Sequence, residues 1–217
     1  MLTLADVLAD DELMTYIDAA NSQLAALGYT EHGRRHAGLV ARIAGDILAQ
    51  LDYPPGQIEL ARIAGFLHDV GNLIHRESHA LSGALIAQQG LRRLGMPPAD
   101  MAQVMAAIGN HEEERGRPVS PVAAAVVLAD KADVHRSRVQ SPSMDDFDIH
   151  DRVNYAATHS SLRVEQRVIV LRLTIDTAFA SVMNYFEIFL SRMVMMRQAA
   201  TVLGCDYHLV INDVRLS

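Results

Sequence analysis

This 217-residue chain carries its clearest structural signal in residues 64–72, Ala64-Gly-Phe-Leu-His-Asp-Val-Gly-Asn72. It closes an apolar segment, Ile58 to Val70, that has the texture of a buried helix, and Gly71-Asn72 then ends the segment. The stretch places an imidazole, His68, directly before a carboxylate, Asp69. A buried carboxylate is costly unless a cation or several hydrogen bonds neutralise it. Because neutral imidazole and carboxylate are ligands for divalent metals, the pair is expected to face a metal-holding cavity.

Other helical segments on either side of this stretch add inward polar groups. His36 falls on the apolar face of the preceding helix, four residues before Val40, and is therefore aimed inward. Three more helices contribute at their ends or near them, through His79, His111 and Asp130. Two alternatives stay open, because His75 competes with His79, and Asp133 lies one turn beyond Asp130 on the same face.

The rest of the chain predicts a mainly α fold with a small appendage. Hydrophobic periodicity, with Gly28 and Gly95 as stops and Thr30 as a cap, predicts helices over residues 13–27, 30–51, 58–70, 78–94, 99–110 and 121–138. Residues 141–151 form a polar, acidic loop in this interpretation. Two strands within 162–175, a helix over 178–203 and an alternating segment over 207–216 follow. We therefore expect a helical domain over residues 1–140, then a linker and a β-β-α-β subdomain over residues 141–217.

Composition narrows the classes of function. The net charge of −7 disfavours wrapping of a long nucleic acid. The single cysteine, Cys205, can form neither an intramolecular disulfide nor a thiolate cage, so a metal must use nitrogen and oxygen ligands. The N-terminal residues are acidic and do not resemble a secretory signal, and the longest strongly apolar run has only eight residues, Val122 to Ala129. A cytoplasmic protein without a membrane span is expected.

The order of these residues resembles the HD superfamily of metal-dependent phosphohydrolases, whose pattern is a lone His, a His-Asp pair and a late Asp on a helix. The resemblance covers residues 30–138 and implies an HD-domain helical bundle. It places the core metal ligands on His36, His68, Asp69 and Asp130, and the further histidines of the two-metal branch on His79 and His111. In that assignment Asp69 bridges two ions, and His68 and Asp69 form the catalytic pair.

Two branches of the superfamily share further segments with this chain. Residues 79–84, 107–111 and 129–131 are similar to the hydrolases of symmetrical dinucleoside polyphosphates. Residues 110–118 are similar to a loop of the cyclic-dinucleotide phosphodiesterases, although the Tyr and one His of that loop are missing. Both groups usually carry Lys where this chain has Asn72.

The resemblance implies a definite chemistry. Two cations about 3.5–4 Å apart activate a water molecule and stabilise the attacking and leaving oxygens of a phosphoryl displacement. A ligand set of His and carboxylate favours Fe or Mn, with Zn, Ni, Co or Mg as alternatives. Glu112, beside His111, is a candidate proton acceptor. Positive side chains near the ligands are candidates for binding the phosphate: Arg34, Arg35, Lys131, His135, Arg136 and Arg138.

The leading hypothesis is therefore a phosphohydrolase of a small phosphate ester or anhydride, with a nucleotide or dinucleotide as substrate. The alternatives are an HD-type di-iron oxygenase and a nucleotide-binding regulatory module without turnover. The strands of the appendage predict either a homodimer or a lid over the metal pocket.

Several other residues have simpler interpretations. His32 is expected to face solvent, Arg76, Arg92 and Arg93 to be ordinary surface residues, and His150-Asp151 to lie in the polar loop without binding a metal. A set of methionines in the last helix is expected in the core or at a subunit contact: Met183, Met193, Met195 and Met196.

Overall fold

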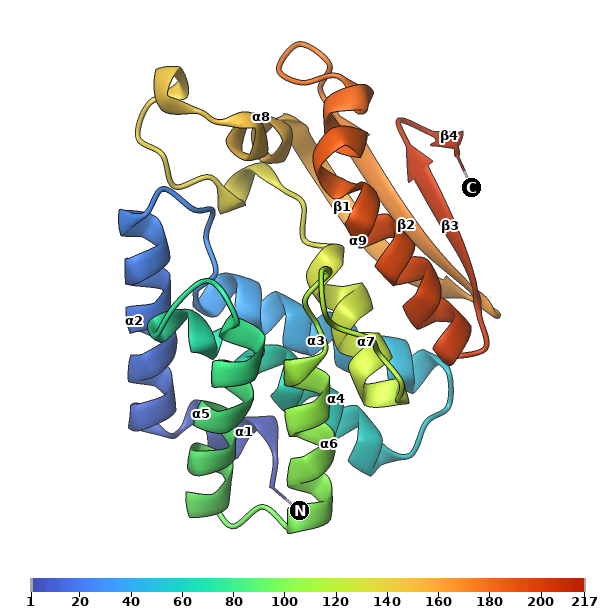
Figure 1. Ribbon diagram of the computed structural model, residues 1–217. Helices are drawn as coiled ribbons and strands as arrows, with labels where there is room; N and C mark the ends of the chain where they lie inside the picture. Colours follow the sequence, from blue (N-terminus) through green and yellow to red (C-terminus); the bar gives the residue numbers. More distant parts are fainter. Residues whose placement is uncertain (1, 217) are drawn as a thin grey trace.

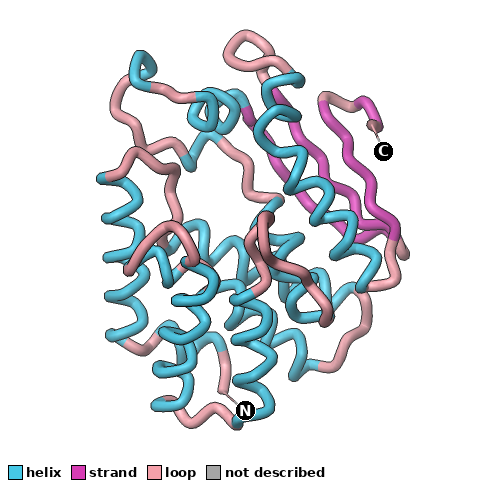
Figure 2. Tube along the Cα trace, in the orientation of Figure 1, coloured by secondary structure: helices cyan, strands magenta, loops and turns pink. Residues whose placement is uncertain are grey.

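The computed structural model describes residues 2–216, which form a block of helices with a small sheet beside it (Figure 1). The strands are confined to the C-terminal part of the chain (Figure 2). This arrangement confirms the expected fold class, a mainly helical bundle with a small C-terminal appendage. Within residues 2–216, no helix combines the length and the apolar character that crossing a bilayer requires.

The helical block is built around one buried helix. Its elements are α1 (Leu4–Leu8), α2 (Asp11–Ala26), α3 (Arg34–Gln50), α4 (Pro55–Leu67), α5 (His79–Arg93), α6 (Pro98–Gly109) and α7 (Pro121–Lys131). In α7, every residue after Pro121 is buried, because the helix packs against α3, α4, α6 and α9 (Val182–Val202). Small and β-branched side chains permit this close packing on all sides. As a result, the polar residues at its end, Asp130 and Lys131, are held inside the protein.

The helix predicted over residues 178–203 begins only at Val182. Three further boundaries are wrong in the helices that carry or precede His36, the His-Asp pair and Asp130. The helix that carries His36 begins at Arg34 with Gly33 as N-cap, and Thr30 does not cap it. The helix before the His-Asp pair ends at Leu67, so His68 is its C-cap and residues 70–73 form a separate 3-10 helix, η1 (Val70–Leu73). The helix from Pro121 ends at Lys131 instead of Arg138, because Arg138 turns back to donate from its Nη1 to the carbonyl oxygen of Asp133 at 3.0 Å.

The C-terminal part forms one four-stranded sheet. Its strands are β1 (Ala157–Glu165), β2 (Val168–Ile175), β3 (Asp206–Ile211) and β4 (Val214–Arg215), in the order β1-β2-β3-β4. The β1-β2 and β3-β4 pairs are antiparallel, whereas β2 and β3 are parallel and are connected through α9. The β-β-α-β order agrees with the prediction, and β4 is a short addition to it.

Helix α8 (Ile149–Ala156) is not among the predicted elements, and its first three residues belong to the predicted polar loop over residues 141–151. Asp148 caps this helix by accepting a hydrogen bond from the backbone N–H of Asp151 at 2.8 Å. Helix α9 joins the two parts, since it contacts both α7 and β3. Three of its methionines, Met193, Met195 and Met196, are buried in this contact, whereas Met183 is exposed.

Asp10 fixes the start of α2 and offers a test of the helical block. Its carboxylate accepts a hydrogen bond from Leu13 N at 2.9 Å and two from Arg93, at 2.6 and 2.9 Å. The bonds from Arg93 hold the pKa of Asp10 below its ordinary value of 3.8. We expect Asp10→Ala to lower the free energy of unfolding by about 1–2 kcal/mol, and Asp10→Asn, which keeps a capping oxygen, to lower it less.

Urea denaturation at several pH values separates the two contributions of Asp10. The folded pKa is depressed, so the charge contribution is fully present above the unfolded pKa and is lost as pH falls through the folded value. The stability difference between the wild type and Asp10→Asn should therefore shrink in acid. A difference that stays constant down to the acid limit would contradict the ion-pair explanation.

Candidate metal centre

Six buried side chains converge where five helices meet. His36 is the third residue of α3, His68 and Asp69 follow the last residue of α4, and His79 opens α5. The remaining two come from beyond the end of α6 and from the end of α7, as His111 and Asp130. None of the six is more than 7% exposed. All six metal ligands that the sequence predicts therefore lie in one cluster.

Asp69 is the centre of this cluster. Its Oδ2 lies 3.1 Å from His68 Nε2 and 3.5 Å from His36 Nε2, and its Oδ1 lies 3.3 Å from His79 Nε2 and 3.7 Å from His111 Nε2. One carboxylate thus faces two pairs of imidazoles with its two oxygens. Two triads bring donor atoms within 4.8 Å of one another: His36, His68 and Asp130, and His68, Asp69 and His111.

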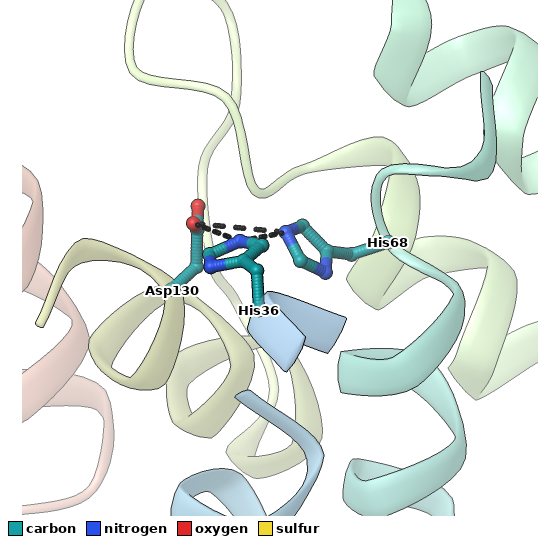
Figure 3. A group of neighbouring side chains, drawn as sticks. All are labelled: His36, His68 and Asp130. Carbon is teal, nitrogen blue, oxygen red and sulfur yellow. Dashed lines mark hydrogen bonds and ion pairs between the residues drawn. The ribbon is translucent and has the colours of Figure 1, made fainter. Parts of the chain in front are cut away.

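Asp130 lies beside the first pair of imidazoles, those of His36 and His68. Its Oδ1 lies 3.3 Å from His36 Nε2 and 3.6 Å from His68 Nε2, and Figure 3 shows the three side chains converging. Asp133 instead lies behind His36, with its Oδ2 2.7 Å from Nδ1 of that ring and 2.9 Å from Arg35 Nη2. Of the two aspartates, Asp130 therefore faces the cluster and Asp133 orients one of its imidazoles. His75 belongs to neither triad and is exposed.

The outer ring nitrogens fix how the imidazoles are oriented. Nδ1 of His68, His79 and His111 lies 2.8, 2.9 and 2.6 Å from the backbone carbonyls of Gly65, Arg76 and Ile108. A carbonyl only accepts, so each Nδ1 carries a hydrogen, and each Nε2 is the ring nitrogen that faces the cluster and can bind a metal once it carries no proton. Asp133 holds His36 in the same way. Such outer partners are typical of metal-binding histidines.

These tautomers make the cluster fit a metal. Nε2 of His36 lies 3.2 Å from Nε2 of His68, and Nε2 of His79 lies 3.1 Å from Nε2 of His111. Two lone pairs at this distance repel each other unless a positive charge lies between them. The donor set of imidazole nitrogen and carboxylate oxygen suits a divalent transition metal. The residues present therefore fit a metal centre of one or two ions.

The charges of the cluster also fit a metal centre. Burial favours the neutral forms of Asp69 and Asp130, but the nearby positive groups together outweigh it, with His68 the strongest for Asp69 and Lys131 the strongest for Asp130, so both pKa values lie well below the usual range. Burial also opposes charge on His68, yet Asp69 and Asp130 raise its pKa to about 10. For His111, burial dominates and lowers the pKa to about 4. Two ionised carboxylates thus require positive charge among the imidazoles.

A recess of about 20 Å³ reaches Asp69, His79, His111 and Asp130. A larger cavity of about 350 Å³ lies next to it. Four side chains line both spaces: His32, Arg76, Arg138 and Arg192. Three guanidinium groups therefore lie where the recess and the larger cavity adjoin, and they would attract an anion there.

The predicted phosphate-binding residues divide into two groups. Lys131 and Arg138 line the recess, and Lys131 Nζ lies 2.7 Å from Asp130 Oδ2. Arg35 and His135 line a different groove, whereas the guanidinium of Arg136 lies 5.1 Å from the ring centre of Tyr155. Arg34 is exposed and forms an ion pair with Asp18. The structure does not bring Arg34, Arg35, His135 or Arg136 to the recess.

The cavity also corrects the interpretations of two residues and adds a third residue that the sequence does not indicate. His32 is buried instead of solvent-facing, and burial lowers its pKa well below 6.5. Arg76 lines the cavity, so the expectation of an ordinary surface residue is wrong. Arg192 was missed, because an arginine in a Met- and Phe-rich helix carries no motif that would place it near His111. Its Nε lies 2.9 Å from Oε1 of Glu113, which follows His111 closely in the chain.

Comparisons with known proteins agree with the geometry. Residues 31–134 match the family model of the HD domain. Ribonuclease Y of Lawsonia intracellularis is 32% identical over 105 residues, which cover 47% of this chain and 18% of that protein. An uncharacterized protein of Methanocaldococcus jannaschii is 28% identical over 98 residues, covering 38% of each chain. This chain therefore spans less than two fifths of either relative. All six residues of the cluster lie inside the matched segment, and the chain contains an HD domain at residues 31–134.

Proposed function

We propose that this protein is a metal-dependent phosphohydrolase that acts on a small phosphate ester or anhydride, with nucleotides and dinucleotides as the first substrates to test. The observation that carries the proposal is Asp69, which faces two pairs of inward-directed imidazoles with its two oxygens. The HD domain supports it, because HD domains belong to a superfamily of metal-dependent phosphohydrolases. Two divalent ions are proposed, with iron or manganese preferred.

The chain's own residues would each serve the reaction in a definite way. When bound, the ions would supply a nucleophilic water near neutral pH and Lewis-acid stabilisation of the phosphoryl oxygens. Arg76, Arg138 and Arg192 would attract the phosphate to the place where the recess and the larger cavity adjoin. Glu112 lines the recess and is the proposed acceptor of the proton that water releases, and its Oε1 lies 3.9 Å from Nδ1, the outer ring nitrogen of His79. Glu113 is unsuited to that role, because Lys131 and Arg192 hold it as an ion pair and lower its pKa to about 2.

Metal analysis followed by a substrate screen tests this proposal. We expect the purified protein to contain Fe or Mn and to release phosphate from members of a panel of nucleotides, dinucleotides and phosphodiesters. A chelator should abolish turnover, and added Mn or Fe should restore it. Metal-loaded protein without turnover on the whole panel would contradict the proposal. Oxygen uptake in the presence of a small polyol or phosphonate would favour the di-iron oxygenase instead.

Asp133 offers a more specific test of the centre. Its carboxylate accepts from His36 Nδ1 at 2.7 Å and is itself held by Arg35, so it orients an imidazole without facing the cluster. We expect Asp133→Asn to weaken metal affinity by about 10- to 100-fold, because outer-shell partners of this kind fix ring orientation and basicity. Metal titration of the apo-protein measures the effect. An unchanged affinity would exclude this role for Asp133.

The other expectations from the sequence stay predictions. A homodimer would form through the C-terminal sheet, where β1 is an edge strand. Light scattering at micromolar concentration would test it, and a monomer would contradict it. The division at residue 140, the cytoplasmic location and the absence of a long nucleic acid partner also stay predictions.

A further inference from the structure

The cavity next to the metal cluster has walls from two parts of the chain. The side toward the HD helices consists of Gly28, Tyr29, Thr30, His32, Arg76 and Arg138. The opposite side consists of residues that follow the HD segment, from the start of α8 and from α9: Asp148, His150, Asp151, Asn154, Phe189 and Arg192. The cavity volume of about 350 Å³ lies at the small end of the range for ligand sites. It can hold one small molecule beside the cluster.

The end of the cavity beside the six cluster residues is cationic, and neighbouring groups hold its arginines in place. The guanidinium of Arg138 is buried and donates three hydrogen bonds to the carbonyls of Glu31 and Asp133, at 3.0 to 3.1 Å. Arg192 stacks on the ring of Phe189 at 4.2 Å and pairs with Glu113 through Nε. Among residues 2–216, no hydrogen bond engages its two terminal nitrogens. These groups are preorganised for the oxygens of a phosphate.

The far end of the cavity has the opposite character, because it presents oxygen acceptors. Asp151 is only 5% exposed, and Asp148 lies beside it at the start of α8. Asn154 is 4% exposed, and its Nδ2 donates to the carbonyl of His150 at 2.9 Å. Its Oδ1 is buried and accepts no hydrogen bond within the described residues. A buried acceptor without a partner is rare in native proteins and indicates a missing donor.

We propose that this cavity binds the organic part of a phosphorylated small molecule that carries hydroxyl or amino groups at the end opposite its phosphate. Arg192 and Arg138 would hold the phosphate beside the metal cluster, while Asp151 and Asn154 Oδ1 would accept hydrogen bonds from the other end. An ester with an apolar end would leave both acceptors unpaired, so it is disfavoured. The inference rests on the proposed phosphohydrolase function and deepens it, since it assigns substrate selection to α8.

Three probes distinguish the classes of substrate. Ribose 5-phosphate and adenosine 5′-monophosphate carry donors at the end away from the phosphate, and n-hexyl phosphate, which is also an alkyl ester, carries none. We expect the wild type to have a higher kcat/KM for one of the first two than for n-hexyl phosphate, and the quotient of the two values is the selectivity ratio. The preferred probe shows whether a sugar phosphate or a nucleotide supplies the donors. Equal or lower kcat/KM for both donor-bearing probes would overturn the inference.

Two substitutions test the assigned residues. Asp151→Asn and Asn154→Ala should each reduce the selectivity ratio by about tenfold, the size expected when a site loses one hydrogen bond to its substrate. Asp146→Asn is the matched control, because Asp146 is exposed, lies just before α8 and does not line the cavity. It should keep the wild-type ratio. A ratio that neither cavity variant changes would overturn the inference.

A binding measurement separates failure of the inference from failure of the proposed function. If no probe is hydrolysed, the phosphohydrolase proposal fails, and calorimetry then compares binding of ribose 5-phosphate, adenosine 5′-monophosphate and inorganic phosphate. Tighter binding of one organic phosphate, lost in Asp151→Asn and kept in Asp146→Asn, would support the cavity assignment. Equal affinity for all three would overturn it.

Discussion

Replacing Asp69 by alanine is expected to remove bound metal and hydrolytic activity together. Each of its two oxygens faces a different pair of imidazoles, at distances of 3.1 to 3.7 Å from their Nε2 atoms. Loss of this one side chain therefore takes a ligand from both halves of the centre. Mutation of a residue that only orients a metal ligand already lowers metal affinity or activity by about 10- to 100-fold. We therefore expect loss of the ligand itself to lower activity by more than about 100-fold.

Metal content and turnover should be measured on the same preparation of the Asp69→Ala variant. Asp46→Ala is the matched control, because Asp46 lies on α3 with His36 but its half-exposed side chain pairs with Arg42. It should keep wild-type metal content and rate. Full metal occupancy in Asp69→Ala would show that this carboxylate does not bridge the two pairs of histidines.

Replacing Gly71 by alanine is expected to lower the free energy of unfolding by about 3 kcal/mol or more, as severe overpacking does. A Cβ atom on Gly71 would lie 1.9 Å from the carbonyl oxygen of His79 and 2.4 Å from the backbone nitrogen of Gly83. Both are backbone atoms of α5, so they cannot move aside as a flexible side chain would. The 3-10 helix η1, which follows Asp69, would have to separate from α5, and metal binding should weaken as well.

Gly38→Ala is the control for this substitution. Gly38 lies inside α3, and a Cβ atom there would meet nothing within 4 Å. Alanine should therefore stabilise the helix by about 0.5–1 kcal/mol. Urea denaturation measures both variants. Wild-type stability of Gly71→Ala would mean that η1 and α5 do not pack as closely as the structure shows.

The sequence predicts most of the fold because its apolar residues repeat with clear helical periods. It fails where polar contacts decide the structure. The end of α7 is one case: Asp133, Val134 and Arg138 continue the helical pattern, but the buried guanidinium of Arg138 binds the carbonyls of Glu31 and Asp133, which turns the chain. Helix α8 is another, since its acidic first turn resembles a loop until Asp148 is recognised as a cap.

The site divides in the same way. The six cluster residues are found from the sequence, because each lies at a helix end or on an apolar face within one recognisable order. The cavity is not found, because its walls depend on tertiary contacts between distant segments. Nothing local to Arg192 indicates that Glu113 and Phe189 will hold it beside the cluster. His32 is similar, since its first-turn position indicates exposure and only packing buries it.

The two-part wall of the cavity separates two kinds of evolutionary change. All six cluster residues lie between residues 31 and 134, whereas Asp151, Asn154 and Arg192 lie after that segment. Substitutions in α8 can therefore accumulate without touching the ion-binding side chains. Evolution could therefore change the substrate while the six cluster residues stay the same. The ion pair between Glu113 and Arg192 connects the two parts of the chain, so it would have to be kept.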